Sequence, residues 1–189
     1  MNKAVIVLIP LVIIGVLVIG GFGLYNGLVS AQEEVKAAWA QVENQYQRRA
    51  DLIPNLVETV KGYAEQEKGV LEEVTKLRSQ WGEARQSGDI NKTFQAAQGM
   101  ESALGRLMVV VERYPDLKSN QNFMKLQDQL EGTENRISVE RRRYNEIALN
   151  YNKKIRTFPG LLFASAFGFE RMPLFEADKD AKKAPKVKF

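Results

Sequence analysis

The regular spacing of apolar residues constrains the fold of this chain more than any other feature. Over residues 35–81, apolar and aromatic side chains recur at alternating steps of four and three residues, and only Arg49 and Glu67 are polar at these positions. Such steps place side chains along one stripe of an α-helix, as in helices that pack through a heptad seam. The pattern therefore predicts long helices that pack against one another.

Two similar seams follow, and each is bounded by residues that end helices. Ser87, Gly88 and Asp89 interrupt the first pattern, and Pro115 ends the second because proline cannot continue a helix. The third seam covers residues 123–151, with Ser119 or Asn120 as its N-cap. No stretch alternates with a period of two, so we predict an all-α antiparallel bundle.

The chain begins with an apolar run that contains no charge from residue 4 to residue 25. About 20 apolar residues at ~1.5 Å each cross the hydrocarbon core of a bilayer. The run predicts a transmembrane anchor over residues 1–28. The alternative is a signal peptide cleaved near Val29-Ser30-Ala31, although such peptides have shorter apolar runs of ~7–15 residues. Gly23 and Gly27 would let a second helix approach closely, so both are candidates for self-association.

The sequence leaves the number of bundle helices open, with four favoured and three possible. The first heptad run is either one long helix or two helices that fold back near Gly69. Residues 31–68 and 119–156 have equal lengths, and an even number of helices returns the chain to the membrane; both observations favour four. The unbroken heptad phase across Gly69 favours one long helix instead.

The bundle is expected to cover residues 29–157, followed by an apolar segment over 158–175 and a disordered, charged tail over 176–189. Residues 158–169 are uncharged but too few to span a bilayer. This segment can cap its own bundle, lie on the membrane surface or contact a neighbouring subunit. Its candidate contact residues are the large apolar ones Leu161, Leu162, Phe163 and Phe167.

The composition argues against an enzyme. The chain has no cysteine and no histidine, which removes thiol catalysis, the commonest general base and the commonest transition-metal ligands. We therefore expect no catalytic, cofactor-binding or metal-binding residues, and no small-molecule substrate. The sequence pI is about 9.2, but basic and acidic residues nearly balance within residues 29–157, so nucleic acid is not an expected partner.

Three residues of the first heptad run are candidates for a structural role. Arg49 occupies a seam position, so it needs an acidic partner if it is buried, or it extends from the seam to solvent. Asp51 lies two residues away. Pro54 falls inside the run and predicts a kink, because the seam keeps its phase through it.

Three blocks of sequence resemble the LemA family of bacterial membrane proteins. They are AWAQVENQYQRRADLIPNLVETVKGYA (residues 38–64), YPDLKSNQNFMKLQDQLEGTENRI (114–137) and RRRYNEIALNYNKKIRTFPG (141–160). The resemblance implies an N-terminal anchor and an antiparallel bundle of long helices. It implies no enzymatic activity. The family's association with membrane proteases and with the magnetosome membrane suggests a role in organising membrane proteins.

These observations favour a non-enzymatic, membrane-anchored scaffold that self-associates, with membrane lipid, copies of itself and other membrane proteins as partners. The alternative is an adaptor or regulator of a membrane protease or transporter. We expect a single-pass protein of the bacterial cytoplasmic (inner) membrane. Lys3 and the amino terminus lie before the uncharged run and Glu33 and Glu34 beyond it, which favours a bundle outside the cytoplasm.

Overall fold

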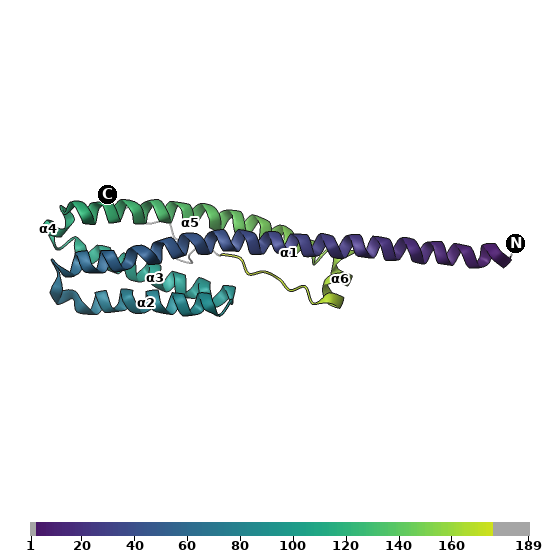
Figure 1. Cartoon of the computed structure of the whole chain (residues 1–189), viewed down its shortest axis with the longest axis horizontal. Coiled ribbons are helices and arrows are strands. Elements are labelled where there is room, and N and C mark those ends of the chain that lie inside the picture. Colours follow the sequence, from purple (N-terminus) through teal and green to yellow (C-terminus); the bar gives the residue numbers. More distant parts are fainter. Residues whose placement is uncertain (1–2, 176–189) are drawn as a thin grey trace, which may run out of the picture. The chain divides into compact units, whose positions relative to one another are not determined.

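The structure is a computed structural model that describes residues 3–175, without the side chains of residues 3–10, 13, 14, 16 and 17. The regular elements of its described part are all helices, with no strand among them, which confirms the all-α prediction. The elements (Figure 1) are α1 (Lys3–Lys61), the 3-10 helix η1 (Glu65–Glu67), α2 (Lys68–Gln86), α3 (Ile90–Val111), α4 (Pro115–Lys118), α5 (Gln121–Lys154) and α6 (Gly160–Phe167).

The first heptad run forms two helices, as favoured, but it folds back earlier than predicted. Helix α1 ends at Lys61 and α2 begins at Lys68, so Gly69 lies inside α2 and not at the turn. The turn is closed by bonds from the Tyr63 and Ala64 amides to the Val60 oxygen, at 3.0 and 2.8 Å. Tyr63, a seam position in the sequence, is 45% exposed. The seam is therefore broken at the turn.

The chain divides into two compact units. The bundle unit runs from Ala40 to Arg141, and the strap unit joins the residues up to Trp39 with those from Arg142 onward. Helices α1 and α5 each contribute to both units. Among the described residues, no helix offers a stretch long and apolar enough for a membrane crossing. Half of the predicted anchor, and the whole tail of residues 176–189, lie outside the residues whose side chains are described.

The bundle unit is an antiparallel arrangement of four helical segments, from α1, α2, α3 and α5 (Figure 1). Polar contacts between neighbouring helices give their directions. Arg78 and Arg85 of α2 bond to Ala50 and Gln47 of α1, so these helices run in opposite senses. The core is apolar and aromatic, and its largest fully buried side chains are Tyr46, Ile53, Leu56, Trp81, Met100, Leu107, Leu117, Phe123 and Ile137. Burying a large apolar side chain contributes roughly 1.5–3 kcal/mol.

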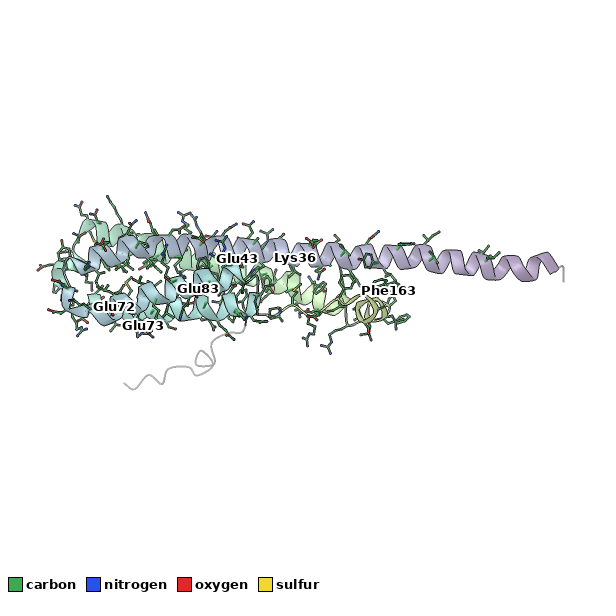
Figure 2. All side chains as sticks on the ribbon, turned by 60° about the horizontal axis from the view of Figure 1, so that its bottom comes forward. Lys36, Glu43, Glu72, Glu73, Glu83 and Phe163 are labelled. Carbon is green, nitrogen blue, oxygen red and sulfur yellow. The ribbon has the colours of Figure 1, made fainter. Side chains whose placement is uncertain are left out.

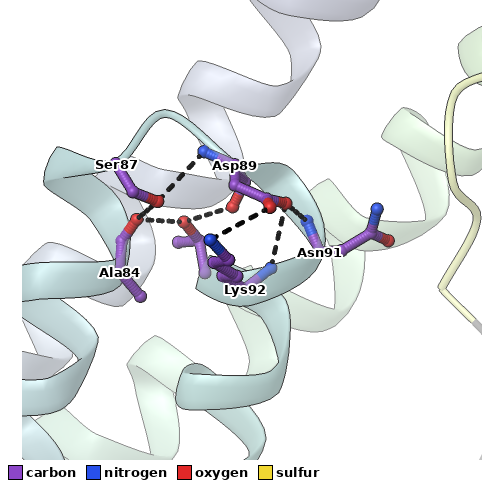
Figure 3. A network of polar contacts seen from close by, with 6 residues as sticks. Ala84, Ser87, Asp89, Asn91 and Lys92 are labelled. Carbon is purple, nitrogen blue, oxygen red and sulfur yellow. Dashed lines mark hydrogen bonds and ion pairs between the residues drawn. The ribbon is translucent and has the colours of Figure 1, made fainter.

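The turn between α2 and α3 is closed by side chains (Figure 3). The Asp89 carboxylate accepts bonds from the amides of Asn91 and Lys92 at 2.9 and 3.2 Å, which makes Asp89 the N-cap of α3. The Ser87 hydroxyl donates to the Ala84 oxygen at 2.6 Å and accepts from the Asp89 amide at 3.3 Å. Gly88 has a φ of +69°, a conformation that glycine adopts without strain.

Candidate functional site

A short extended segment of the strap unit is held by its main chain. Residues 169–175, which we call the strap, follow α6 and form no helix or strand. The side-chain amide of Asn152 donates to the main-chain oxygen of Met172 and accepts from its main-chain N–H, both at 2.9 Å. Asn145 makes the same pair of bonds with Phe175, at 2.9 and 2.8 Å. Each asparagine thus satisfies both main-chain groups of one strap residue.

The spacing of the two asparagines matches that of the strap. Asn145 and Asn152 are seven residues apart in α5, which is about 10.5 Å at 1.5 Å per residue. Met172 and Phe175 are three residues apart, which is about 10 Å in an extended chain. The side chains of Asn145 and Asn152, two helical turns apart, are therefore spaced to bond to two strap residues that are three positions apart. The strap runs opposite to α5.

An aromatic cluster holds the end of the strap. The Phe175 ring stacks on Trp39 of α1 with centroids 5.8 Å apart, and its centroid lies 5.3 Å from that of Tyr144. The Tyr144 hydroxyl donates to the Pro173 oxygen at 2.9 Å. Burial raises the pKa of Tyr144 to about 12, so its hydroxyl stays protonated and able to donate. We call Trp39, Tyr144, Asn145 and Asn152 the clasp.

Helix α6 packs on the part of α1 that precedes the clasp. The Phe163 ring (labelled in Figure 2) is 3.4 Å from where a Cβ on Gly21 would lie, and the Phe167 ring is 5.0 Å from that of Tyr25. Ala164 is buried. Four large side chains around α6 are nevertheless more than half exposed, with exposed fractions of 80% for Phe158, 51% for Leu161, 61% for Leu162 and 59% for Phe167.

The glycines predicted for self-association lie on an open surface of the strap unit. Gly23 and Gly27 are exposed, and a Cβ on either would have no heavy atom within 4 Å. No described part of the chain covers them. The structure brings neither glycine into contact with Leu161, Leu162, Phe163 or Phe167; of the glycines nearby, Gly21 is the one that Phe163 approaches.

The bundle unit contains a buried charge. Arg49 is 3% exposed, and its guanidinium donates to the carboxylate of Glu134 in α5. Burial lowers the pKa of Arg49 and nearby Glu101 partly offsets this effect. Asp51 is not its partner: it is exposed and accepts a bond from Gln47 at 2.6 Å. Pro54 is also exposed and lies within α1, which continues to Lys61.

An open cavity of about 350 Å³ adjoins this ion pair between α1, α3 and α5. Its wall combines apolar residues such as Leu104, Met108 and Phe123 with the charges of Arg49 and Glu134. Among the described residues, no group of three or more acidic side chains gathers where it could hold a metal ion.

The clasp was not found from the sequence, although a signal for it exists. The dipeptide Tyr-Asn occurs twice at a spacing of seven, as Tyr144-Asn145 and Tyr151-Asn152. A heptad reading assigns the tyrosines to the seam, and the tyrosines are indeed buried. The same heptad pattern predicts that the asparagines after the tyrosines face solvent, because it describes only how helices pack on one another and not how a non-helical segment binds to them.

The fold and these contacts define an all-helical bundle protein whose C-terminal segment is clasped to its first and last long helices. Comparison with known sequences identifies the family of the chain. The chain matches the LemA family over residues 38–189, and it belongs to that family. The match includes the clasp, α6 and the strap.

Three relatives are similar over most of the chain. Magnetosome protein MamQ 2 of Paramagnetospirillum magneticum is 29% identical over 184 residues, covering 85% of this chain and 67% of the relative. Magnetosome protein MamQ of Magnetospirillum gryphiswaldense is 28% identical over the same shares. Protein LemA of Metamycoplasma hominis is 26% identical over 180 residues, covering 94% of this chain and 80% of the relative.

Proposed function

We propose that this protein is a non-enzymatic, membrane-anchored scaffold that self-associates and so organises other proteins of the bacterial inner membrane. The observation that carries the proposal is the apolar surface of α6. Leu161, Leu162 and Phe167 of α6, and Phe158 just before it, are each more than half exposed, whereas Phe163 approaches Gly21 of α1 and Ala164 is buried. Contiguous exposed apolar surface of this kind is typical of interaction sites.

The position of α6 on α1 relates this surface to the membrane. Phe163 approaches Gly21, and Gly160 lies near Leu28. Gly21 falls within the uncharged run of residues 4–25, so α6 lies beside the outer end of that run. If the run spans the bilayer, copies of α6 lie at one height near the membrane surface. A second copy anchored in the same membrane can then cover the exposed leucines.

Substituting the exposed leucines tests this function. Leu161→Asp/Leu162→Asp places charges on the outer surface of α6 and leaves Phe163 on α1. We expect oligomers of the full chain in mild detergent, measured by light scattering, to dissociate at concentrations at which the unchanged chain remains assembled. The matched control is Val139→Asp/Leu149→Asp, which changes two exposed apolar residues of α5. The control should assemble normally.

Two results would contradict the proposal. Oligomers of the leucine variant that dissociate no more readily than those of the control would show that α6 is not the contact surface. An unchanged chain that is monomeric in detergent and in lipid nanodiscs would exclude the scaffold. The chain would then fit better as an adaptor whose apolar surface meets a different membrane protein.

A further inference from the structure

We propose that the strap is exchanged between copies, so that residues 169–175 of one copy occupy the clasp of a second copy. This inference rests on the proposed self-association and names the contact that holds the copies together. It follows from the way in which the clasp recognises the strap, from the reach of the strap and from the apolar surface that precedes it.

The clasp recognises the strap as an extended peptide. Four bonds from Asn145 and Asn152 go to main-chain groups of Met172 and Phe175, as when a peptide adds to the edge of a sheet. The Phe175 ring is also held, between Trp39 and Tyr144, whereas the Phe169 ring lies outside the clasp, 5.8 Å from that of Tyr25. These contacts are the same whichever copy supplies the strap.

The strap is long enough to reach a neighbouring clasp. Gly168 has a φ of +72° and ends α6, with the Phe169 amide bonded to the Ala164 oxygen at 3.0 Å. Met172 lies four residues after Gly168, and four fully extended residue steps span about 13–14 Å. Packed helices lie about 8–10 Å apart. A change at Gly168 and Phe169 is therefore enough to direct the strap onto an adjoining copy.

The free energy of exchange depends on what else the second copy buries. The self-docked and exchanged forms make the same clasp contacts, so a modest additional interface decides between them. Leu161 and Leu162 supply that interface, because they are exposed in the single copy and lie in α6, the helix that precedes the strap. Anchoring in one membrane also raises the effective concentration of neighbouring clasps.

A complementation experiment tests the exchange with the full chain in mild detergent. In the first variant, residues 169–175 are replaced by a glycine–serine segment of equal length, which removes the strap and keeps the clasp. In the second, Asn145→Ala/Asn152→Ala keeps the strap and disables the clasp. Each variant carries a different affinity tag. We expect the two variants to copurify about tenfold more than either does with a differently tagged copy of itself.

The outcomes separate this inference from the proposed function. If unchanged chains copurify but the two variants pair no better with each other than with themselves, the strap stays in its own copy and the scaffold proposal stands. If unchanged chains do not copurify, both proposals fail. Circular dichroism of each variant checks whether its helices are retained, which distinguishes loss of pairing from loss of folding.

Introduced cysteines give a second readout that leaves most of the clasp intact. The chain has no cysteine of its own, so any disulfide reports an introduced pair. One copy carries Asn152→Cys and the other carries Met172→Cys, so neither copy alone contains both introduced cysteines. We expect a disulfide-linked dimer when the two are coexpressed and oxidised, and none when Met172→Cys is paired with Lys153→Cys, an exposed neighbour on α5. A mixture that yields no more dimer than this control would overturn the exchange.

Discussion

The Nε of Arg78 donates a hydrogen bond to the main-chain oxygen of Ala50 at 2.9 Å, and that oxygen is the one that Pro54 leaves without its helical donor. A proline has no amide hydrogen and its ring crowds the carbonyl four residues earlier. Helix α1 nevertheless continues through Pro54 to Lys61. A side chain of α2 thus replaces the missing bond of α1, and the proline couples the two helices.

This coupling can be measured with a double-mutant cycle. Arg78→Met should destabilise the bundle by about 1–2 kcal/mol, because the Ala50 oxygen then lacks its donor. In a Pro54→Ala background the amide of residue 54 supplies the bond, so the same change should cost about 1 kcal/mol less. Thermal unfolding of the full chain, followed by circular dichroism, gives both values. The control is Lys76→Met, at an exposed position of α2. If Arg78→Met destabilised the bundle equally in both backgrounds, Arg78 would not act by replacing the bond that the proline removes.

The ion pair of Arg49 and Glu134 should respond unequally to loss of its two members. Arg49 is buried, whereas the side chain of Glu134 is 41% exposed. Glu134→Ala leaves a buried guanidinium without its partner, and we expect a cost of about 1–3 kcal/mol. Arg49→Met removes the buried charge and leaves Glu134 in contact with water, so its cost should be smaller.

Denaturant unfolding of both variants checks this order. The control is Arg48→Met, which changes an exposed neighbour and should alter stability by less than about 0.5 kcal/mol. An Arg49→Met variant less stable than Glu134→Ala would mean that Arg49 contributes through bonds other than the one to Glu134.

The helical fold was largely predictable because heptad spacing depends on local geometry alone. The third seam correctly gave the buried residues Phe123, Leu130 and Ile137. The turn was misplaced because Gly62 and Gly69 stand at equivalent heptad positions, and spacing cannot choose between them. The turn that forms is joined to a residue far away in the sequence, since Asn120 donates to the Tyr63 hydroxyl at 2.8 Å across one end of the bundle unit.

The clasp was not predictable in the same way. Its asparagines act on main-chain groups about twenty to thirty residues away, and main-chain recognition leaves no pattern in the side chains of the strap. The apolar residues of α6 were identified as contact residues, but the sequence did not separate Phe163, which faces α1, from Leu161 and Leu162, which face solvent. That distinction depends on how α6 is rotated about its axis.

The strap should be released at high pH. The pKa of Tyr144 is about 12 when its hydroxyl is buried against the strap and about 10 in an unfolded chain. Its contribution to docking is therefore complete below pH 10 and is lost as the pH rises through 12. Fluorescence of Trp39 in a Trp81→Phe background, which leaves one tryptophan, should report the change. Tyr144→Phe should abolish this step, and a step of equal size in that variant would assign it to another group.

Gly160 should be the glycine least tolerant of a side chain. A Cβ at this position would overlap the main-chain oxygen of Lys154, which cannot move without shifting the end of α5. Overpacking of this kind costs typically 1–3 kcal/mol. Because Gly160 begins α6, Gly160→Ala should displace α6 from α1 and loosen the strap behind it. Trypsin cleavage after Arg171, an exposed strap residue, should therefore become faster.

Two other glycines provide the matched control for this change. Gly105 and Gly132 lie inside α3 and α5, and a Cβ on either would meet no heavy atom within 4 Å. Alanine at an open helical position stabilises by roughly 0.5–1 kcal/mol, because it limits the unfolded chain. Gly105→Ala and Gly132→Ala should thus raise the melting temperature and leave cleavage after Arg171 unchanged. If Gly160→Ala behaved as they do, the close approach of α6 to the end of α5 would be wrong, and the path of the strap into the clasp would have to be redrawn.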